Sequence, residues 1–561
     1  PGAITPIHHI QGAGPASPLV GRTVTTRGIV TAVFPGLRGW FLQDESGDGD
    51  PRTSDGVFVF ANRGPIDVAV GERIELTATV TEYAARAGEP TLTELVRPSV
   101  VARLGTGRIA PTPVALPEAV DGDLERVEGM LVTFADPLTV SQTFFLGRHG
   151  QLTLSAGGRM TKPTQLHRPG SPAAAALAAL NARRRIVLDD GRSAARTADD
   201  AGPVPYRGVD GTVRAGDTVT GLTGVVDSGR VSGGGGVEVD YRVHPTMTPV
   251  ITRVNARPAA PPPVGGTHRV AAFNLGNWFT TFRDGTTSAG GAGHGCLPSG
   301  TTTDCRGAAD ARAFASQRAR IVAAIAALDA DVVGLVEVQR NGGVAVADLV
   351  AALNARPGSV RYAAVPDPIA GVGTDAIQVA IIHRPARVAA VGGALADTAV
   401  VHGRHPVAQT FATADGARFS VVVAHFKSKR CVGADGPDLD RGDGQGCYND
   451  RRRRQAAALA GFVGTVQTAA GDPDVFVIGD LNAYGREDPL ETLAAAGLAD
   501  QLARCAGPAD YSYVFDGEAG TLDHVLATPS AAVQVTGAAH WHIDADEPPD
   551  LDDATGGHRP A

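Results

Sequence analysis

The first hundred residues alternate apolar and polar side chains in short runs that are separated by turn-forming residues. Alternation with a period of two is typical of strands with one buried face. The runs predict five strands: Arg22–Phe34, Gly39–Gln43, Gly56–Phe60, Val68–Tyr83 and Thr91–Val96. We therefore expect a β domain at residues 1–110, and five strands of this size fit the barrel of an OB-fold, which frequently binds single-stranded nucleic acid.

Two features of this domain are candidates for binding, and each has an ordinary alternative. The aromatic rings of Trp40, Phe41, Phe58 and Phe60 either stack on nucleobases or fill the barrel, and we favour the second. The oxygen-rich, glycine-broken segment Asp44–Asp50 has spacing suited to Ca²⁺. It lacks the bidentate glutamate of an EF-hand, which favours a solvated turn.

A second β-rich region is expected at residues 111–254. Its predicted strands are Gly129–Phe134, Leu152–Leu154, Arg185–Leu188 and Thr218–Val226, with an alanine-rich helix at Pro172–Ala182. Nothing in this region resembles a group of catalytic residues. A proline-rich linker at residues 255–267 marks a boundary, because such segments form semi-rigid spacers.

From residue 268 to residue 561, short apolar runs alternate with helical segments, the pattern of an α/β domain. We expect helices near Asp310–Leu328 and at Asp450–Val463. Strands are expected at Val270–Phe273, Val332–Val336, Ala376–Ile382, Ser420–Ala424 and Val475–Ile478. The whole chain is therefore predicted to be a multidomain α+β protein.

Polar side chains stand at the ends of these strands. Asp480 and Asn482 follow the last run, and as neighbours at i and i+2 they point to the same side. Asn274, Glu337 and His425 follow three other strands, and Asp523 begins a further apolar stretch. Strand ends of this kind can converge on one edge of an α/β sheet.

These residue types suit the hydrolysis of a phosphate ester. Glu337 and Asn274 offer the oxygen ligands that Mg²⁺ or Ca²⁺ prefers, and such an ion would neutralise the phosphate. His425 and Asn482 would donate to phosphate oxygens, and Asp480 would orient or deprotonate the attacking water. Each residue alone is commonly a loop carboxylate, a turn former or a structural histidine, so the indication comes from the combination.

A run of four arginines opens the second predicted helix. Such a run is usually a solvated helix face. Because it lies next to the candidate site in the sequence, Arg451 and Arg454 are candidates for contact with phosphate.

Composition narrows the choice of partners. The net charge of −9 means that the field of the whole molecule does not attract nucleic acid, so a polyanion would be drawn by a local basic patch or by bound metal. No apolar run of about 18 residues occurs, and no membrane span is expected. The start at Pro1, without Met, suggests a processed N-terminus.

Four of the five cysteines form two close pairs without the Cys-x-x-Cys spacing of zinc sites. We expect disulfides between Cys296 and Cys305 and between Cys431 and Cys447, with Cys505 free. Four reduced, buried thiols are the alternative. Disulfides imply an oxidising, extracellular location.

Five stretches occur in an order that resembles a known superfamily: Phe273-Asn274, Gly334–Val338, Ala424–Lys427, Gly479–Ala483 and Leu522–His524. They resemble the endonuclease/exonuclease/phosphatase superfamily, whose fold is DNase I-like. More narrowly, the chain resembles secreted bacterial nucleases of the ExeM/NucH type. That likeness is carried by Gly444–Asn449, Cys305–Ala308, Trp541–Pro548, Ile10–Gly12 and Thr53–Val59.

The resemblance implies a four-layer α/β sandwich and hydrolysis of phosphodiester bonds in DNA or RNA. The cofactor would be Mg²⁺ or Mn²⁺, with Ca²⁺ as a further candidate. It assigns Asn274 and Glu337 to the metal site and His425 to phosphate contact. It makes Asp480 and Asn482 the catalytic pair, and it gives Asp523 the task of orienting a catalytic histidine.

One departure concerns that histidine. The family closes with a Ser-Asp-His type of motif on a final strand, whereas this sequence reads Gly-Gly-His-Arg-Pro-Ala at residues 556–561. Either His558 is a diverged version or the sequence stops before the motif, and we favour the second. In that case Asp523 lacks its partner, and cleavage would be weak.

Two other functions stay open. The chain could hydrolyse a lipid or small phosphoester, as a sphingomyelinase does, although the OB-fold argues against this. It could also bind nucleic acid through a hydrolase domain that is catalytically silent.

Overall fold

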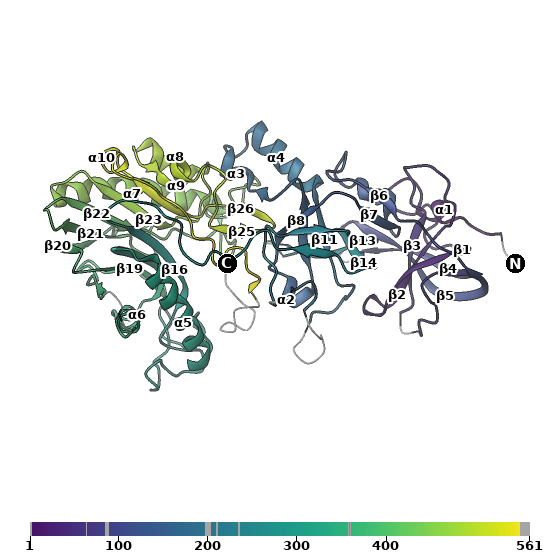
Figure 1. Ribbon diagram of the computed structural model, residues 1–561, viewed down its shortest axis with the longest axis horizontal. Coiled ribbons are helices and arrows are strands. Elements are labelled where there is room, and N and C mark those ends of the chain that lie inside the picture. Colours follow the sequence, from purple (N-terminus) through teal and green to yellow (C-terminus); the bar gives the residue numbers. More distant parts are fainter. Residues whose placement is uncertain are drawn as a thin grey trace.

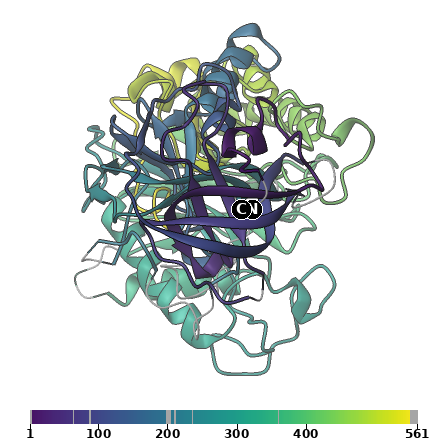
Figure 2. The same ribbon diagram turned by 90° about the vertical axis from the view of Figure 1, so that its right-hand side faces the viewer.

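The structure is a computed structural model, and it describes residues 3–62, 64–84, 89–196, 204–208, 211–233, 236–356, 358 and 361–549. Three bodies of β-structure lie in a row in chain order (Figure 1). Figure 2 looks along this row from the N-terminal end, with the barrel in front. Among the described helices, none is long and apolar enough to cross a membrane.

The first body is a closed barrel with the strand order β1-β2-β3-β5-β4. Its strands are β1 (Thr23–Phe34), β2 (Gly39–Gln43), β3 (Gly56–Phe60), β4 (Glu72–Ala84) and β5 (Thr91–Thr106). All five begin near the positions that the alternation predicts, but β5 continues ten residues beyond the expected end at Val96. β4 begins four residues later than expected, because the turn before it ends at Gly71, whose φ of 85° suits glycine.

Of the four aromatic residues considered for base stacking, Trp40, Phe41 and Phe58 are buried and Phe60 is half-buried, so the idea that they stack on bases is wrong. Trp40 packs in the barrel core. Phe41 and Phe58 lie 4.9 Å apart between ring centroids and pack against Val225 of the next body, with Phe60 half-buried beside them. The face made by β2 and β3 is therefore covered by protein.

Backbone contacts also hold the barrel against the second body. The Gln11 side chain joins the two bodies, because its Nε2 donates to the carbonyl oxygen of Gly56 at 2.7 Å and to that of Glu128 in the second body at 3.3 Å. Gly56 and Gly129 pack so closely that a Cβ on Gly56 would lie 2.3 Å from the Gly129 carbonyl. Glycine at both positions allows this approach of two backbones.

The second body is a nine-stranded sheet in the order β15-β12-β8-β9-β11-β14-β13-β7-β6. Its strands are β6 (Thr112–Val114), β7 (Leu131–Phe134), β8 (Leu138–Gln142), β9 (Leu152–Ala156), β11 (Arg185–Leu188), β12 (Thr218–Thr220), β13 (Thr223–Gly233), β14 (Gly236–Pro245) and β15 (Val250–Thr252). The run predicted as one strand at Thr218–Val226 is two strands, because Gly221 turns the chain with a φ of 65°. Helix α4 (Pro172–Arg183) is capped by Ser171, whose Oγ accepts from the Ala174 amide.

The third body contains two sheets. The first has the order β16-β17-β19-β18 and the second the order β20-β21-β22-β23-β27-β24. Their strands are β16 (Val270–Trp278), β17 (Val332–Gln339), β18 (Ala363–Ala364), β19 (Ile377–His383), β20 (Val388–Ala396), β21 (Val407–Thr413), β22 (Arg418–Val423), β23 (Val475–Asp480), β24 (Ala499–Asp500) and β27 (Asp523–Ala527). Val336, Ile381, Val421 and Ile478 belong to the core between the sheets.

Helices cover the two outer faces of these sheets. α5 (Ala311–Leu328) and α6 (Val344–Asn354) pack on the first sheet through a core that includes Phe314 and Leu349. α7 (Asn449–Ala470) and α8 (Asp488–Ala495) pack on the second through Leu459 and Leu493. The result is the expected order of layers, helix, sheet, sheet, helix, with the two helical layers on opposite sides in Figure 1.

Short strands join the second body to the third. β10 (Met160–Thr161) pairs in parallel with β26 (Glu518–Gly520), which pairs with β25 (Tyr513–Phe515). Asp546 is fully buried and accepts from Arg159 Nη1 at 2.9 Å and from Tyr511 Oη at 2.8 Å. The bond from Arg159 crosses from the second body to the third, so the second body forms part of the framework around the sandwich.

The cysteines pair as predicted. Cys296 bonds to Cys305 and Cys431 bonds to Cys447, while Cys505 is free and exposed. Between β2 and β3, the acidic segment is a turn in which the Asp50 amide donates to Asp48 Oδ1 at 2.8 Å. This geometry agrees with a solvated turn, and the Ca²⁺ alternative stays a prediction.

Candidate active site

Two carboxylates meet at the end of the second sheet. β23 and β27 are antiparallel, and Asp480 pairs in register with Asp523. Between the apolar part of β23 and Asp480 stands Gly479, with a φ of 125°, where a Cβ would lie 2.3 Å from the Ala424 carbonyl oxygen. Glycine is required there, and it leads the strand past Ala424 so that Asp480 reaches the edge, where it is only 9% exposed.

Asn482 is fixed next to Asp480 by two hydrogen bonds. Its backbone amide donates to Asp480 Oδ1 at 2.8 Å, and its Nδ2 donates to the Phe426 carbonyl at 3.1 Å. Asn482 has a φ of 48°, a left-handed conformation that asparagine tolerates better than most residues. The second N–H of its amide group remains to bind another oxygen.

Glu337 reaches the same place from the first sheet. The register between β17 and β19 shifts around it, and its φ is 62°. An irregularity of this kind re-aims a side chain. Burial raises the pKa of its carboxylate, and the neighbouring Asn274 side chain and Asn277 backbone oppose that rise. Asn274 therefore lies next to Glu337 within the predicted metal site.

The carboxylates raise one another's proton affinity. Burial, followed by the charges of Asp523 and Glu337, raises the pKa of Asp480 well above its ordinary value. Burial also raises the pKa of Glu337 and of Asp523. The site therefore gathers more negative charge than its own surroundings stabilise, and it would gain from a bound cation.

Arg404 is the basic side chain that the sequence analysis missed. It lies in the loop before β21, where its Nε donates to the His425 carbonyl at 3.2 Å and its Nη2 donates to the Phe426 carbonyl. Its charge lowers the pKa of both Glu337 and Asp480. No periodicity or spacing in the Gly403–Pro406 segment indicates this role.

His425 lies behind Asp480 rather than in the open cavity. Its Nε2 is 3.6 Å from Asp480 Oδ2, and the ring is 4% exposed. Burial, with the charges of Arg404 and Lys427, lowers the pKa of His425 well below its ordinary value. At 3.6 Å the imidazole packs against Asp480 without a hydrogen bond, and phosphate contact by His425 stays a prediction.

The arginine run at the start of α7 does not reach the site. Arg454 Nε pairs with Asp450 Oδ2 at 2.8 Å on the exposed helix face, and Arg451 Nε donates to the Val401 carbonyl at 3.2 Å. Arg452 is buried and donates to the carbonyls of Cys447 and Gln445, each at 2.7 Å. The predicted phosphate contacts of Arg451 and Arg454 therefore find no support in the geometry.

Two histidines lie close to Asp523. His540 Nε2 is 3.1 Å from the Asp523 carbonyl oxygen, and its Nδ1 is 2.7 Å from Asp510 Oδ2. His524 is buried and bonds to Ala483 and Asp500. The alternative candidate His558 lies outside the described residues.

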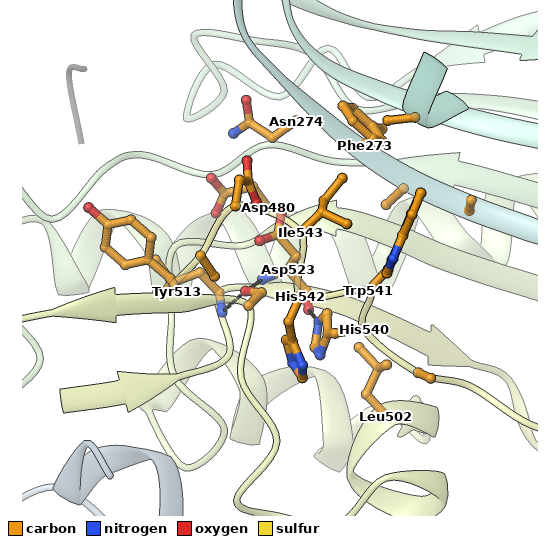
Figure 3. Close-up of a pocket in the computed structure, with 18 of the residues that line it drawn as sticks. Phe273, Asn274, Asp480, Leu502, Tyr513, Asp523, His540, Trp541, His542 and Ile543 are labelled. Atoms are coloured by element: carbon orange, nitrogen blue, oxygen red, sulfur yellow. Dashed lines mark hydrogen bonds between the residues drawn. The ribbon is translucent and has the colours of Figure 1, made fainter. Parts of the chain in front are cut away.

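The carboxylates open into one large cavity, called the cleft below, of about 2780 Å³. In Figure 3, Asn274 lies above Asp480, Asp523 lies beneath Asp480, and His540 lies farther down. The far wall of the cleft comes from the nine-stranded body, through residues such as Phe144 and Phe145. The cleft therefore extends well beyond the carboxylates, as an extended substrate requires.

Comparison with known proteins agrees with this geometry. Residues 291–546 match the sequence profile of the Endonuclease/Exonuclease/phosphatase family. Residues 291–546 of the third body are therefore similar to the domain that this family profile describes. Glu337, His425, Asp480, Asn482 and Asp523 all lie inside the matched span.

Several solved structures are similar to part of this chain. The human Nocturnin catalytic domain is 18% identical, with 38% of this chain and 76% of that chain covered and a TM-score of 0.28. An endonuclease/exonuclease/phosphatase from Bacteroides vulgatus is 15% identical, with 42% and 88% covered and a TM-score of 0.30. D. rerio TDP2 complexed with single strand DNA product is 18% identical, with 39% and 79% covered and a TM-score of 0.26. No curated protein matches the chain.

Proposed function

We propose that this chain is a divalent-metal-dependent phosphodiesterase that cleaves extracellular nucleic acid, with DNA as the first candidate and RNA as the second. The observation that carries the proposal is the meeting of Glu337, Asp480 and Asp523, from two sheets, at one end of a long cleft. Metal-dependent hydrolysis of a phosphate ester needs oxygen ligands for the ion, and these carboxylates provide them.

In this proposal, Asp480 takes the proton of the attacking water. Because its pKa is raised, the Asp480 carboxylate binds a proton more tightly than an ordinary aspartate does, which suits a general base. The Asn482 backbone amide fixes the carboxylate, and His425 lies behind it. The remaining N–H of Asn482 would donate to a phosphate oxygen as charge develops there.

The donor set fits a hard cation such as Mg²⁺ or Mn²⁺. Two groups of three acidic or histidine side chains in the described residues have their donor atoms within 4.8 Å of one another. They are Asp510–His540–His542 and His8–Asp48–Asp55. Glu337, Asp480 and Asp523 are not such a group, so these three carboxylates lie too far apart to enclose an ion by themselves. Mg²⁺ commonly binds through one or two carboxylates, water and substrate phosphate. Glu337, which lies next to Asn274, would provide the main ligand, and the bound ion would neutralise the phosphate.

The remaining domains support nucleic acid as the substrate. The N-terminal barrel has the five strands of an OB-fold, and we propose that the chain is of the secreted ExeM/NucH type. Its two disulfides accord with secretion. Because β2 and β3 are covered, the barrel would contact nucleic acid only through other surfaces.

The test is a side-by-side hydrolysis assay. Plasmid DNA, an RNA oligonucleotide and a sphingomyelin vesicle are each incubated with Mg²⁺, with Mn²⁺ or with EDTA. Metal-dependent cleavage of nucleic acid, lost in Asp480→Asn, is the expected result. Hydrolysis of sphingomyelin alone would show that the substrate is a lipid and not a nucleic acid. Binding of DNA without turnover in either metal would show that the hydrolase domain is catalytically inactive.

A further inference from the structure

The cleft contains aromatic side chains that the proposed reaction does not use. Tyr513 and Phe515 lie on β25 and line the cleft, and both are half-buried. Their rings are nearly parallel, with an interplanar angle of 23° and 6.4 Å between centroids. That spacing is roughly twice the 3.4 Å between successive nucleotides of one strand in a duplex. It therefore suits the bases of an extended, unstacked strand.

These rings begin next to the catalytic carboxylates. Figure 3 shows Tyr513 beside Asp480. Tyr484, at the same end of the cleft, has its pKa raised well above the ordinary value by burial and by charges that include those of Tyr513 and Asp480. Lys429 Nζ lies 5.0 Å from the centroid of the Tyr484 ring. Tyr513 thus lies at the end of the cleft that contains the carboxylates.

A second aromatic pair continues from the nine-stranded body. β8 packs against β25, and Gly517 lies close to Ser141 of that strand. Two residues beyond the end of β8 stand Phe144, 42% exposed, and Phe145, with 4.8 Å between their ring centroids. Both line the cleft. An exposed phenylalanine is costly in water, and its position on the wall of a binding cleft indicates a ligand surface.

Charge in the cleft is consistent with a polyanion. Arg430 lines it, is exposed, and forms no ion pair with any acidic side chain in the part of the chain that the structure describes. Arg430 directly follows Lys429, whose ammonium group lies over the Tyr484 ring. The positive charge of Arg430 is therefore on the segment that contacts Tyr484. Aromatic faces combined with a basic groove are the means by which proteins bind single strands without sequence preference.

We propose that Tyr513, Phe515, Phe144 and Phe145 form a stacking track that binds the unpaired bases of a single-stranded nucleic acid and leads the strand to Asp480. The inference rests on the proposed function and deepens it by naming the form of the substrate. Bases in a duplex are already paired and stacked, so their faces are not free for these rings. The track therefore selects single strands over duplexes.

The test separates base stacking from phosphate contact. Affinities of fluorescein-labelled oligothymidylate and of an abasic strand of equal length are measured by anisotropy in EDTA, where no turnover occurs. The wild-type protein should bind the oligothymidylate at least about fivefold more tightly than the abasic strand. In Phe144→Ala/Phe145→Ala this ratio should fall toward one, while Phe144→Trp should keep it.

Tyr83→Ala is the matched control, because Tyr83 is a 52% exposed aromatic residue on the barrel and does not line the cleft. It should keep the wild-type ratio, and thermal unfolding should show all variants folded. Equal affinity of the wild-type protein for both strands, or an unchanged ratio in the double variant, would overturn the track. Failure of the proposed function is seen separately, as absence of metal-dependent hydrolysis of any nucleic acid.

Discussion

Asp480 and Asp523 face each other as register partners on β23 and β27, so two acids that belong to neighbouring strands share one buried edge. Burial and the charge of Asp523 raise the pKa of Asp480. The two carboxylates therefore repel each other when both are ionised. This repulsion affects the activity of the site, the stability of the fold and the binding of a metal ion.

Asp480→Asn should reduce kcat for nucleic acid by about 10²- to 10⁴-fold, the contribution of a positioned base. It should not unfold the protein. Because it removes a buried charge that Asp523 and Glu337 repel, the thermal midpoint without metal at neutral pH should stay the same or rise. Steady-state kinetics and calorimetry check both parts. Wild-type kcat in this variant would remove Asp480 from the reaction.

Metal should stabilise the protein more at alkaline than at acidic pH. An acid whose pKa is raised in the folded state binds its proton more tightly there than in the unfolded chain, so the stability it contributes falls as pH rises above its ordinary pKa of about 4. A divalent cation offsets this loss where the carboxylates are ionised. At about 100 times its Kd, Mg²⁺ should add about 2–3 kcal/mol at mildly alkaline pH and much less at mildly acidic pH.

The control for this prediction is Glu337→Gln/Asp480→Asn, which lacks two of the carboxylates. Thermal unfolding with Mg²⁺ and with EDTA should then show little difference at either pH. If the wild-type protein gains equally from Mg²⁺ at both values of pH, the ion acts somewhere other than at these carboxylates.

Arg404→Met should destabilise the metal-free protein by about 3–5 kcal/mol, because it leaves the neighbouring carboxylates without their buried counter-charge. The cost should shrink at acidic pH, where those groups are protonated. Arg404→Lys keeps the charge but not both contacts to the carbonyls of His425 and Phe426. The stability of this variant should therefore lie between those of the wild-type protein and Arg404→Met. Chemical unfolding at two values of pH measures this, and a pH-independent cost would mean that Arg404 acts only by packing.

Asp546→Asn should loosen the junction between the second and third bodies. Asp546 is fully buried against Arg159 and Tyr511 and also accepts from Asn255 Nδ2 at 2.7 Å. Loss of the charge leaves Arg159 without its anion and should cost about 3–5 kcal/mol. Faster proteolysis within residues 255–267 would report the opening. The exposed neighbour Asp544 provides the comparison, because Asp544→Asn should stay within about 0.5 kcal/mol of wild type.

Local patterns in the sequence predicted much of this molecule. The barrel strands follow from alternation, and the positions of β17, β22 and β23 follow from apolar runs, although β17 continues through Glu337 to Gln339 and β23 includes Asp480. The disulfide pairs follow from close spacing. These features depend on residues near one another in the chain, and sequence patterns report such features directly.

The rest depends on long-range packing that no local pattern encodes. Arg404 comes from an irregular loop and meets Glu337 only after both sheets have assembled. The alternation that placed Phe41 and Phe58 on one face of the barrel could not show that the second body covers that face. Likewise, the arginine run looked basic in the sequence, but Asp450 neutralises its exposed members on the helix surface.

Anomalous diffraction from crystals soaked in MnCl₂ tests the central claim most directly, because it locates the cation that the carboxylates are proposed to bind. A manganese peak should lie within about 2.2 Å of a Glu337 carboxylate oxygen and on the cleft side of Asp480. Crystals with manganese bound at other positions and none at Glu337 would contradict the account.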